Sequence, residues 1–110
     1  MFGNSLSKVE KLIEKKKDAE LAKLAESKDE KVRLAAIVGL GKIRGEASYN
    51  ALVALLRSTE AAIRAAAVNA IAEYGDSKLR AHLEHLLKSE ADAGVIAALH
   101  NALAKVKGNN

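Results

Sequence analysis

The apolar positions of this chain repeat with a period of about 31 residues. Between Asp29 and Gly45 they fall at i, i+4, i+8 and i+11, which is one stripe of a helix with 3.6 residues per turn: Val32, Ala36, Leu40 and Ile43. One period further on, the stripe returns as Ile63, Ala67, Ile71 and Tyr74. Gly45 and Gly75 follow the two stripes, at a position where glycine commonly ends a helix. A fixed period of this length predicts a stack of helical repeats.

A shorter helix is expected before each of these long ones. The short helices are marked by pairs of leucines: Leu21 with Leu24, Leu52 with Leu55, and Leu83 with Leu86. A third long stripe follows with one residue inserted, and it consists of Val95, Leu99, Leu103 and Val106. Before the repeats, a narrow apolar stripe predicts a cap helix over residues 7–16. We therefore expect seven helices, with inner helices near residues 30–43, 61–74 and 94–107.

Short polar joints connect the short helices to the long ones. Ser27 with Glu30, and Ser89 with Asp92, have the spacing of a capping box, in which two side chains satisfy free amides at the start of a helix. Each joint is therefore expected to be a tight turn that starts the next helix.

Two arginines recur in the first turn of the inner helices. Arg33 and Arg64 occupy equivalent positions, where a cation opposes the helix dipole and needs a carboxylate close by. Asp29 and Glu60 stand four residues before them and are spaced to provide it. The sequence therefore predicts that each arginine contacts a joint carboxylate and does not serve as an anion ligand.

These residues suggest a family. The run Val32-Arg33-Leu34-Ala35-Ala36, followed by Leu40-Gly41 and Ile43 and preceded by Asp29, resembles the HEAT-like repeat of the phycobilisome-lyase type. Residues 63–67 through Gly75 repeat it, whereas the third copy has Ile96 in place of the arginine. The resemblance covers roughly residues 18–108. It implies a right-handed stack of antiparallel helix pairs, an all-α solenoid used mostly for binding other proteins, and it does not imply bilin chemistry.

Composition and charge agree with a small helical domain. A chain of 110 residues is about one domain in length, and we expect a single domain over residues 1–110 with frayed ends at 1–6 and 109–110. Hydrophobic residues make up 49% and aromatic residues only 3%, which favours thin, closely packed helices. The net charge of +4 is spread evenly along the chain and does not indicate an anionic partner.

Several classes of protein are disfavoured by what the sequence lacks. It contains no cysteine, so disulfides and thiolate metal sites are excluded. No apolar run approaches the roughly 18 residues of a membrane span, and the first residues do not resemble a signal peptide. We therefore expect a cytoplasmic protein without a membrane association.

One side of the inner helices is short of charge and forms the candidate functional surface. Projection at 100° per residue turns Leu34, Val38 and Gly41 away from the core. A solvated helix row normally carries Glu and Lys, whereas small and amide side chains fill the equivalent positions here. The predicted partner-binding row, including its charged border, consists of Leu34, Val38, Lys42, Ala65, Asn69, Glu73, Ala97, Asn101 and Lys105.

We interpret this row as the concave side of a scaffold that binds a segment of another protein. The alternative for the same residues is that small side chains merely keep successive helices close together. Self-association through the row, as a weak homodimer in place of a monomer, is a further alternative. Nucleic acid is a less favoured partner because Glu73 interrupts the lysines of the border and the row offers no aromatic ring on which a base would stack.

Candidate chemistry is sparse. His82 and His85 are three residues apart, but they align with alanines on the convex side of the stack, and no further ligand completes a metal site there. His100 fits the exposed end of the stack better than it fits a general base. No nucleophile, base and orienting group occur together. We therefore predict no enzyme activity, no metal and no cofactor.

Overall fold

The computed structural model describes residues 2–107, with side chains described from residue 5 onward, and this part of the chain forms seven α-helices, one short 3₁₀ helix and no strand. The prediction of an all-helical fold is confirmed. The helices are α1 (Phe2–Glu14), α2 (Asp18–Leu24), α3 (Glu30–Leu40), α4 (Glu46–Leu55), α5 (Ala61–Tyr74), η1 (Ser77–Leu79), α6 (Arg80–Ser89) and α7 (Ala93–Lys105).

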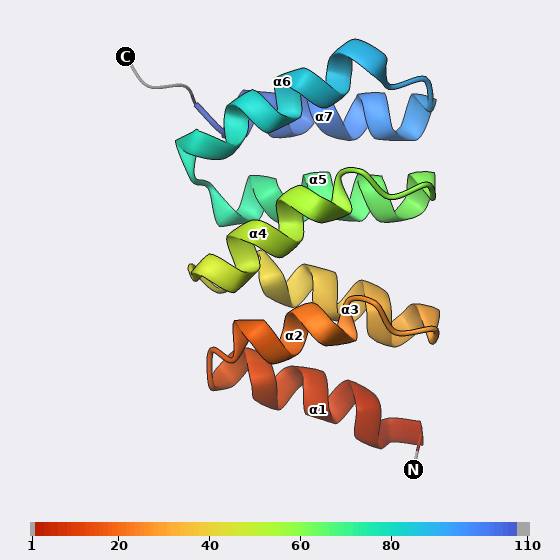
Figure 1. Cartoon of the computed structure of the whole chain (residues 1–110), viewed down its shortest axis with the longest axis vertical. Helices are drawn as coiled ribbons and strands as arrows, with labels where there is room; N and C mark the ends of the chain where they lie inside the picture. Colours follow the sequence, from red (N-terminus) through yellow and green to blue (C-terminus); the bar gives the residue numbers. More distant parts are fainter. Residues whose placement is uncertain (1, 108–110) are drawn as a thin grey trace.

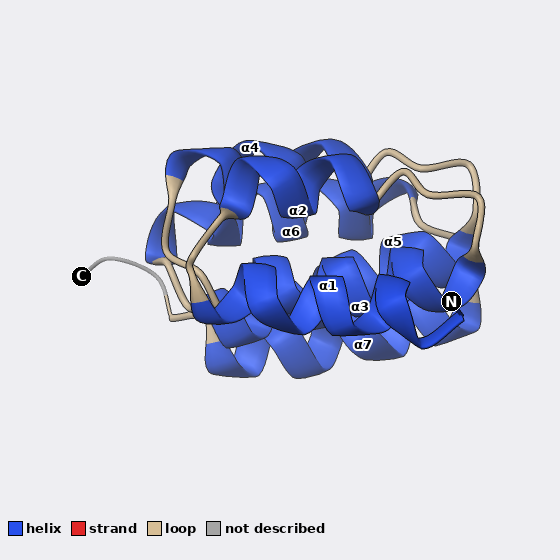
Figure 2. Ribbon diagram, turned by 90° about the horizontal axis from the view of Figure 1, so that it is seen from below, coloured by secondary structure: helices blue, strands red, loops and turns tan. Residues whose placement is uncertain are grey.

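The helices form two layers, which are clearest when the molecule is seen along its long axis (Figure 2). The inner layer contains α1, α3, α5 and α7, and the outer layer contains α2, α4 and α6. Within the inner layer each helix packs beside the next, so that α5 contacts both α3 and α7. The stack measures 44 × 29 × 17 Å, with the helices following one another along its longest axis (Figure 1).

The two layers share one apolar core. The first leucine of each outer pair, Leu21, Leu52 and Leu83, is fully buried, as are most members of the inner stripes. The last stripe differs from the predicted one, because Ala102 is buried and Leu103 is only half-buried. The inserted residue therefore shifts the buried face within α7, and the core stripe of that helix is Val95, Leu99, Ala102 and Val106.

Several helix ends differ from those expected. The first helix begins at Phe2, five residues before its predicted start, although residues 1–6 were expected to fray. Helix α3 ends at Leu40, and Gly41 follows as its C-cap. Gly45, expected to end that helix, is instead the N-cap of α4. The expected tail at 109–110 lies outside the described residues.

The joints are tight turns, as predicted, but the predicted capping boxes are wrong. The N-cap of α3 is Asp29, whose carboxylate accepts hydrogen bonds from the backbone amides of Lys31 and Val32. The hydroxyl of Ser27 accepts from the backbone amide of Asp29 at 3.1 Å and so stabilises the turn before the helix. At the third joint the N-cap is Asp92. In each joint a side chain two residues ahead of the N-cap, Ser27, Ser58 or Glu90, accepts a hydrogen bond from the backbone amide of the cap residue.

No helix in the described part of the chain has the length and apolar character needed to cross a membrane.

Candidate functional site

The predicted row lies on the side of the inner layer that faces away from the outer helices. Val38, on α3, is 52% exposed, an unusually high fraction for a large apolar side chain. The equivalent Asn69 on α5 and Asn101 on α7 are also exposed. Because α3, α5 and α7 lie side by side, these positions form one continuous surface. Of the other row residues, Leu34 and Ala65 are half-buried, whereas Ala97, Lys42, Glu73 and Lys105 are exposed.

The neighbouring helix positions explain why this surface stays open. Ile37 and Val68, one residue before Val38 and Asn69, are fully buried. One residue corresponds to about 100° around a helix, so burying the first side chain turns the second outward. On α7 the position equivalent to Ile37 is His100, which is exposed because no described helix packs beyond it.

Gly41 does not belong to this surface, contrary to the helix projection. It is buried, and a side chain at this position would stand 2.6 Å from the backbone oxygen of Ala70 on α5. Glycine therefore allows the end of α3 to approach α5 closely. The projection placed Gly41 on the open side because a projection of one helix takes no account of α5, which packs against this position.

Arg33 and Arg64 each contact a joint carboxylate, as predicted, but the carboxylate belongs to the following joint. Arg33 pairs with Glu60 at 3.4 Å, across 27 residues of sequence. Arg64 donates two hydrogen bonds of 2.8 Å to Glu90 and a third to the backbone oxygen of Ser58. These ion pairs therefore link successive repeats and are not free to bind an anion.

The second pair is the more buried one. The side chain of Glu90 is 3% exposed, whereas that of Glu60 is 57% exposed. The hydrogen bonds from Arg64 hold the pKa of the Glu90 carboxyl below its ordinary range, against the opposing effect of burial. The pKa of Arg64 is raised by the same hydrogen bonds. The third joint is thus held by a charge-assisted pair in which the charged forms of both Arg64 and Glu90 are favoured.

Two clefts open in the outer layer. One, of about 540 Å³, lies between α2 and α4 and is lined largely by alanines, with Glu26 and Arg57 among its polar residues. The other, of about 420 Å³, lies between α4 and α6 and is lined by Val53, Leu56, Arg57, His82, His85, Leu86 and Ser89.

The structure places His82 and His85 in the outer layer, on the side where they were expected. His82 is half-buried, and its ring meets the edge of Tyr49 at a centroid distance of 6.4 Å. His85 is exposed. The described residues hold no group of three or more His, Asp or Glu side chains that would bind a metal ion.

Arg57 lines both outer-layer clefts, although no sequence pattern singled it out. The equivalent residues one repeat before and after it are Glu26 and Lys88. Because the charge differs between these repeats, the alignment does not predict a common role for the position. Only the separation of α4 from α6 shows that the guanidinium of Arg57 and the two histidines border the same space.

Tyr74 is a packing residue, as expected from its alignment with Ile43. It is 8% exposed, and its hydroxyl donates a hydrogen bond of 3.3 Å to the backbone oxygen of Gly45. The guanidinium of Arg44 lies 5.1 Å from the centre of its ring. Burial raises the pKa of the Tyr74 phenol, so the group stays neutral and keeps its proton to donate.

Comparison with known proteins agrees with this architecture. A family model described as HEAT repeats matches residues 18–104. The match covers most of the chain, and the chain therefore belongs to the HEAT-repeat family. HEAT repeats generally serve as scaffolds for interactions between proteins. The phycobilisome-lyase subtype stays a prediction. No curated protein matches the chain significantly.

Proposed function

We propose that this chain is a protein-interaction scaffold that holds one segment of a partner protein along the row from Leu34 to Asn101, in the cytoplasm. The observation that carries the proposal is the exposure of Val38 in a row whose central members bear no charge. An apolar side chain left open between uncharged neighbours is typical of an interaction surface.

The occupant we propose is an extended or helical segment with small, uncharged side chains. Asn69 and Asn101 are equivalent positions on neighbouring helices, and both side chains are exposed. Each amide group offers a donor and an acceptor, which suits the backbone of a partner. The small side chains of Ala65 and Ala97 allow that backbone to come close. Uncharged partner residues fit because the row presents no countercharge except at its border.

The test introduces charge into the row and leaves the core intact. The double variant Val38→Glu, Asn69→Lys should fold normally, because both side chains are exposed. A partner captured from the source cell and identified by mass spectrometry is then purified, and its affinity is measured by isothermal titration calorimetry. We expect the double variant to weaken binding by at least about tenfold, since the inserted charges would be buried without partners.

The matched control places the same kinds of change on the outer layer. Asn50→Lys with Ala54→Glu alters two exposed positions of α4, and it should leave the affinity unchanged. If the row variant binds as tightly as the natural chain, or if both double variants weaken binding equally, the row is not the binding surface.

Self-association is distinguished by sedimentation velocity. The proposal of a foreign partner predicts a monomer over the micromolar range. A concentration-dependent dimer that is lost in Val38→Glu, Asn69→Lys would contradict it and would make a second copy of the chain the occupant of the row.

A further inference from the structure

The cleft between α4 and α6 places three basic side chains over an apolar floor. Arg57 at the end of α4, with His82 and His85 on α6, forms its polar border. Val53 and Leu56 contribute apolar lining from the α4 side. No carboxylate occurs among the described residues that line this cleft. The cleft therefore combines an apolar surface with an uncompensated positive charge.

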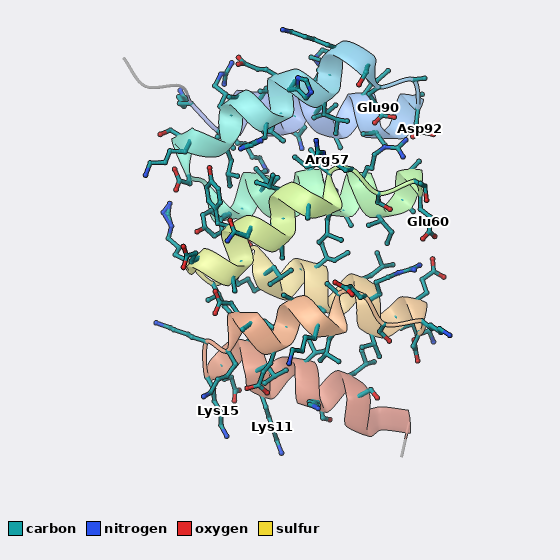
Figure 3. The ribbon with its side chains drawn as sticks, viewed as in Figure 1. Lys11, Lys15, Arg57, Glu60, Glu90 and Asp92 are labelled. Atoms are coloured by element: carbon teal, nitrogen blue, oxygen red, sulfur yellow. The ribbon has the colours of Figure 1, made fainter. Side chains whose placement is uncertain are left out.

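Arg57 differs from the other four arginines of the chain. Arg33 and Arg64 pair with joint glutamates, Arg80 contacts Glu84 and two backbone oxygens of the last helix, and Arg44 lies over an aromatic ring. Among the described residues, the guanidinium of Arg57 has no hydrogen bond, ion pair or ring contact. Figure 3 shows Arg57 reaching from the end of α4 towards α6.

The acidic residues of the adjoining surface are already engaged. Leu86 and Ser89 line both this cleft and a neighbouring hollow that contains Glu90. Glu90 accepts two hydrogen bonds from Arg64 and a third from the backbone amide of Asp92. On α6 itself, Glu84 pairs with Arg80. These carboxylates are therefore not available to neutralise Arg57.

The neighbouring cleft between α2 and α4 provides an internal comparison. It also borders Arg57, but Glu26 lines it as well and offers an opposite charge. Its lining also includes apolar side chains, chiefly alanines together with Leu55, so the charge of Glu26 is what distinguishes it. An anionic group would therefore be favoured on the α6 side of Arg57.

We propose that the cleft between α4 and α6 binds a small amphipathic carboxylate. The planar guanidinium of Arg57 matches a carboxylate with two parallel hydrogen bonds, and His82 and His85 supply further donors. The apolar chain of the ligand lies over Val53 and Leu56. A volume of about 420 Å³ is in the range of small-molecule sites and is too small for a long peptide segment. This site is separate from the partner-binding row, which lies on the other layer.

The experiment is a titration of the ¹⁵N-labelled chain with octanoate, followed by amide chemical shifts. Octanoate should shift the amide signals of Val53, Arg57 and His85 in a saturable manner. Octanamide, which has the same chain without the charge, and acetate, which has the charge without the chain, should each bind at least about tenfold more weakly. If octanamide binds as well as octanoate, no anion is recognised.

Arg57→Gln should weaken octanoate binding by about tenfold, because it removes the charged fork and keeps much of the side-chain volume. Arg44→Gln removes the same charge outside the cleft and should leave the affinity unchanged. The proposal would be overturned if Arg57→Gln bound octanoate as tightly as the natural chain. It would also be overturned if the largest chemical-shift changes were at Ala22 and Ala47, in the other cleft. The double variant Val38→Glu, Asn69→Lys should bind octanoate normally. The octanoate proposal and the proposal of partner binding at the row can therefore fail independently.

Discussion

The arginines in the first turn of α3 and of α5 each form an ion pair with a glutamate of the following joint. The guanidinium of Arg64 is held from three sides, by both carboxylate oxygens of Glu90 and by the oxygen of Ser58. Arg33 makes longer contacts of 3.4 and 3.5 Å to the exposed Glu60. The same residue type at equivalent positions therefore contributes differently, because burial of the acidic partner differs.

We predict that Arg64→Ala lowers the melting temperature clearly more than Arg33→Ala. Loss of Arg64 leaves the buried Glu90 without its main partner, whereas loss of Arg33 frees a glutamate that water can solvate. The exposed pair is expected to contribute within about 1 kcal/mol. Thermal unfolding followed by circular dichroism measures both variants, and equal melting temperatures would contradict the assignment of Glu90 as the stronger partner.

The Glu90 carboxyl also predicts a dependence on pH. Its pKa is lowered in the folded chain by the hydrogen bonds from Arg64, so the unfolded chain binds a proton more readily. The resulting stabilisation is fully present above the ordinary pKa of glutamate, about 4.3, and is lost as the pH falls below it. In urea titrations, the difference in free energy of unfolding between the natural chain and Arg64→Ala should be constant from pH 7 to 5 and shrink towards pH 3. A difference that persists unchanged at pH 3 would show that the ion pair is not its source.

At the scale of the helices, Gly39 within α3 and Gly41 at its C-cap determine how closely the neighbouring helices approach. A side chain at Gly41 would meet the backbone of Ala70 on α5, with three backbone atoms between 2.6 and 3.1 Å away. A side chain at Gly39 would meet the side chain of Ile13 on α1, at 2.8 Å. Backbone cannot move without displacing the whole helix, whereas a side chain can adopt another rotamer.

Gly41→Ala should therefore be more destabilising than Gly39→Ala. We expect a loss of about 1–3 kcal/mol for Gly41→Ala, which is typical of overpacking. For Gly39→Ala the strain at Ile13 is offset by the gain of about 0.5–1 kcal/mol when alanine replaces glycine within a helix. Urea denaturation measures both. Should Gly39→Ala prove the more harmful substitution, the contact between α1 and α3 would be the tighter of the two.

Helix type and layer were predictable from sequence, because each apolar stripe is long and its period is unambiguous. The ends were less predictable: Gly45 was expected to end α3, whereas the helix ends at Leu40 and Gly45 is the N-cap of α4. For the arginines, the presence of a carboxylate partner followed from the helix dipole. Which carboxylate is the partner depends on how far one repeat is displaced from the next in the stack. The sequence around each arginine does not contain this information.

The same distinction applies to the surfaces of the whole molecule. The exposure of Val38 and Asn69 followed from helix projection, because both lie inside regular helices. The cleft containing Arg57 did not, because it depends on the spacing between α4 and α6. Sequence therefore predicts which side of a helix is open, whereas the stack determines which open sides face one another.

Each helix of this stack packs chiefly against its sequence and repeat neighbours, so stability should vary along the molecule. Helices α3 and α5 are the most enclosed: α3 packs against α1, α2, α4 and α5, and α5 packs against α3, α4 and α7. Helix α1 is at one end of the inner layer and contacts only α2 and α3 to any extent. Local opening should therefore require less free energy at α1 than at α3 or α5.

We predict that native-state amide hydrogen exchange follows this order. Amides in the middle of α3 and α5 should exchange most slowly, at a rate set by global unfolding. Amides of α1 should exchange faster than these, because this helix can detach without breaking the contacts between α3 and α5 or between α5 and α7. Mild urea should accelerate exchange in α5 and leave α1 nearly unaffected, since only global unfolding exposes a large surface. If α1 were as protected as α5 and equally sensitive to urea, the stack would unfold as one cooperative unit, and the nearest-neighbour description of its stability would be wrong.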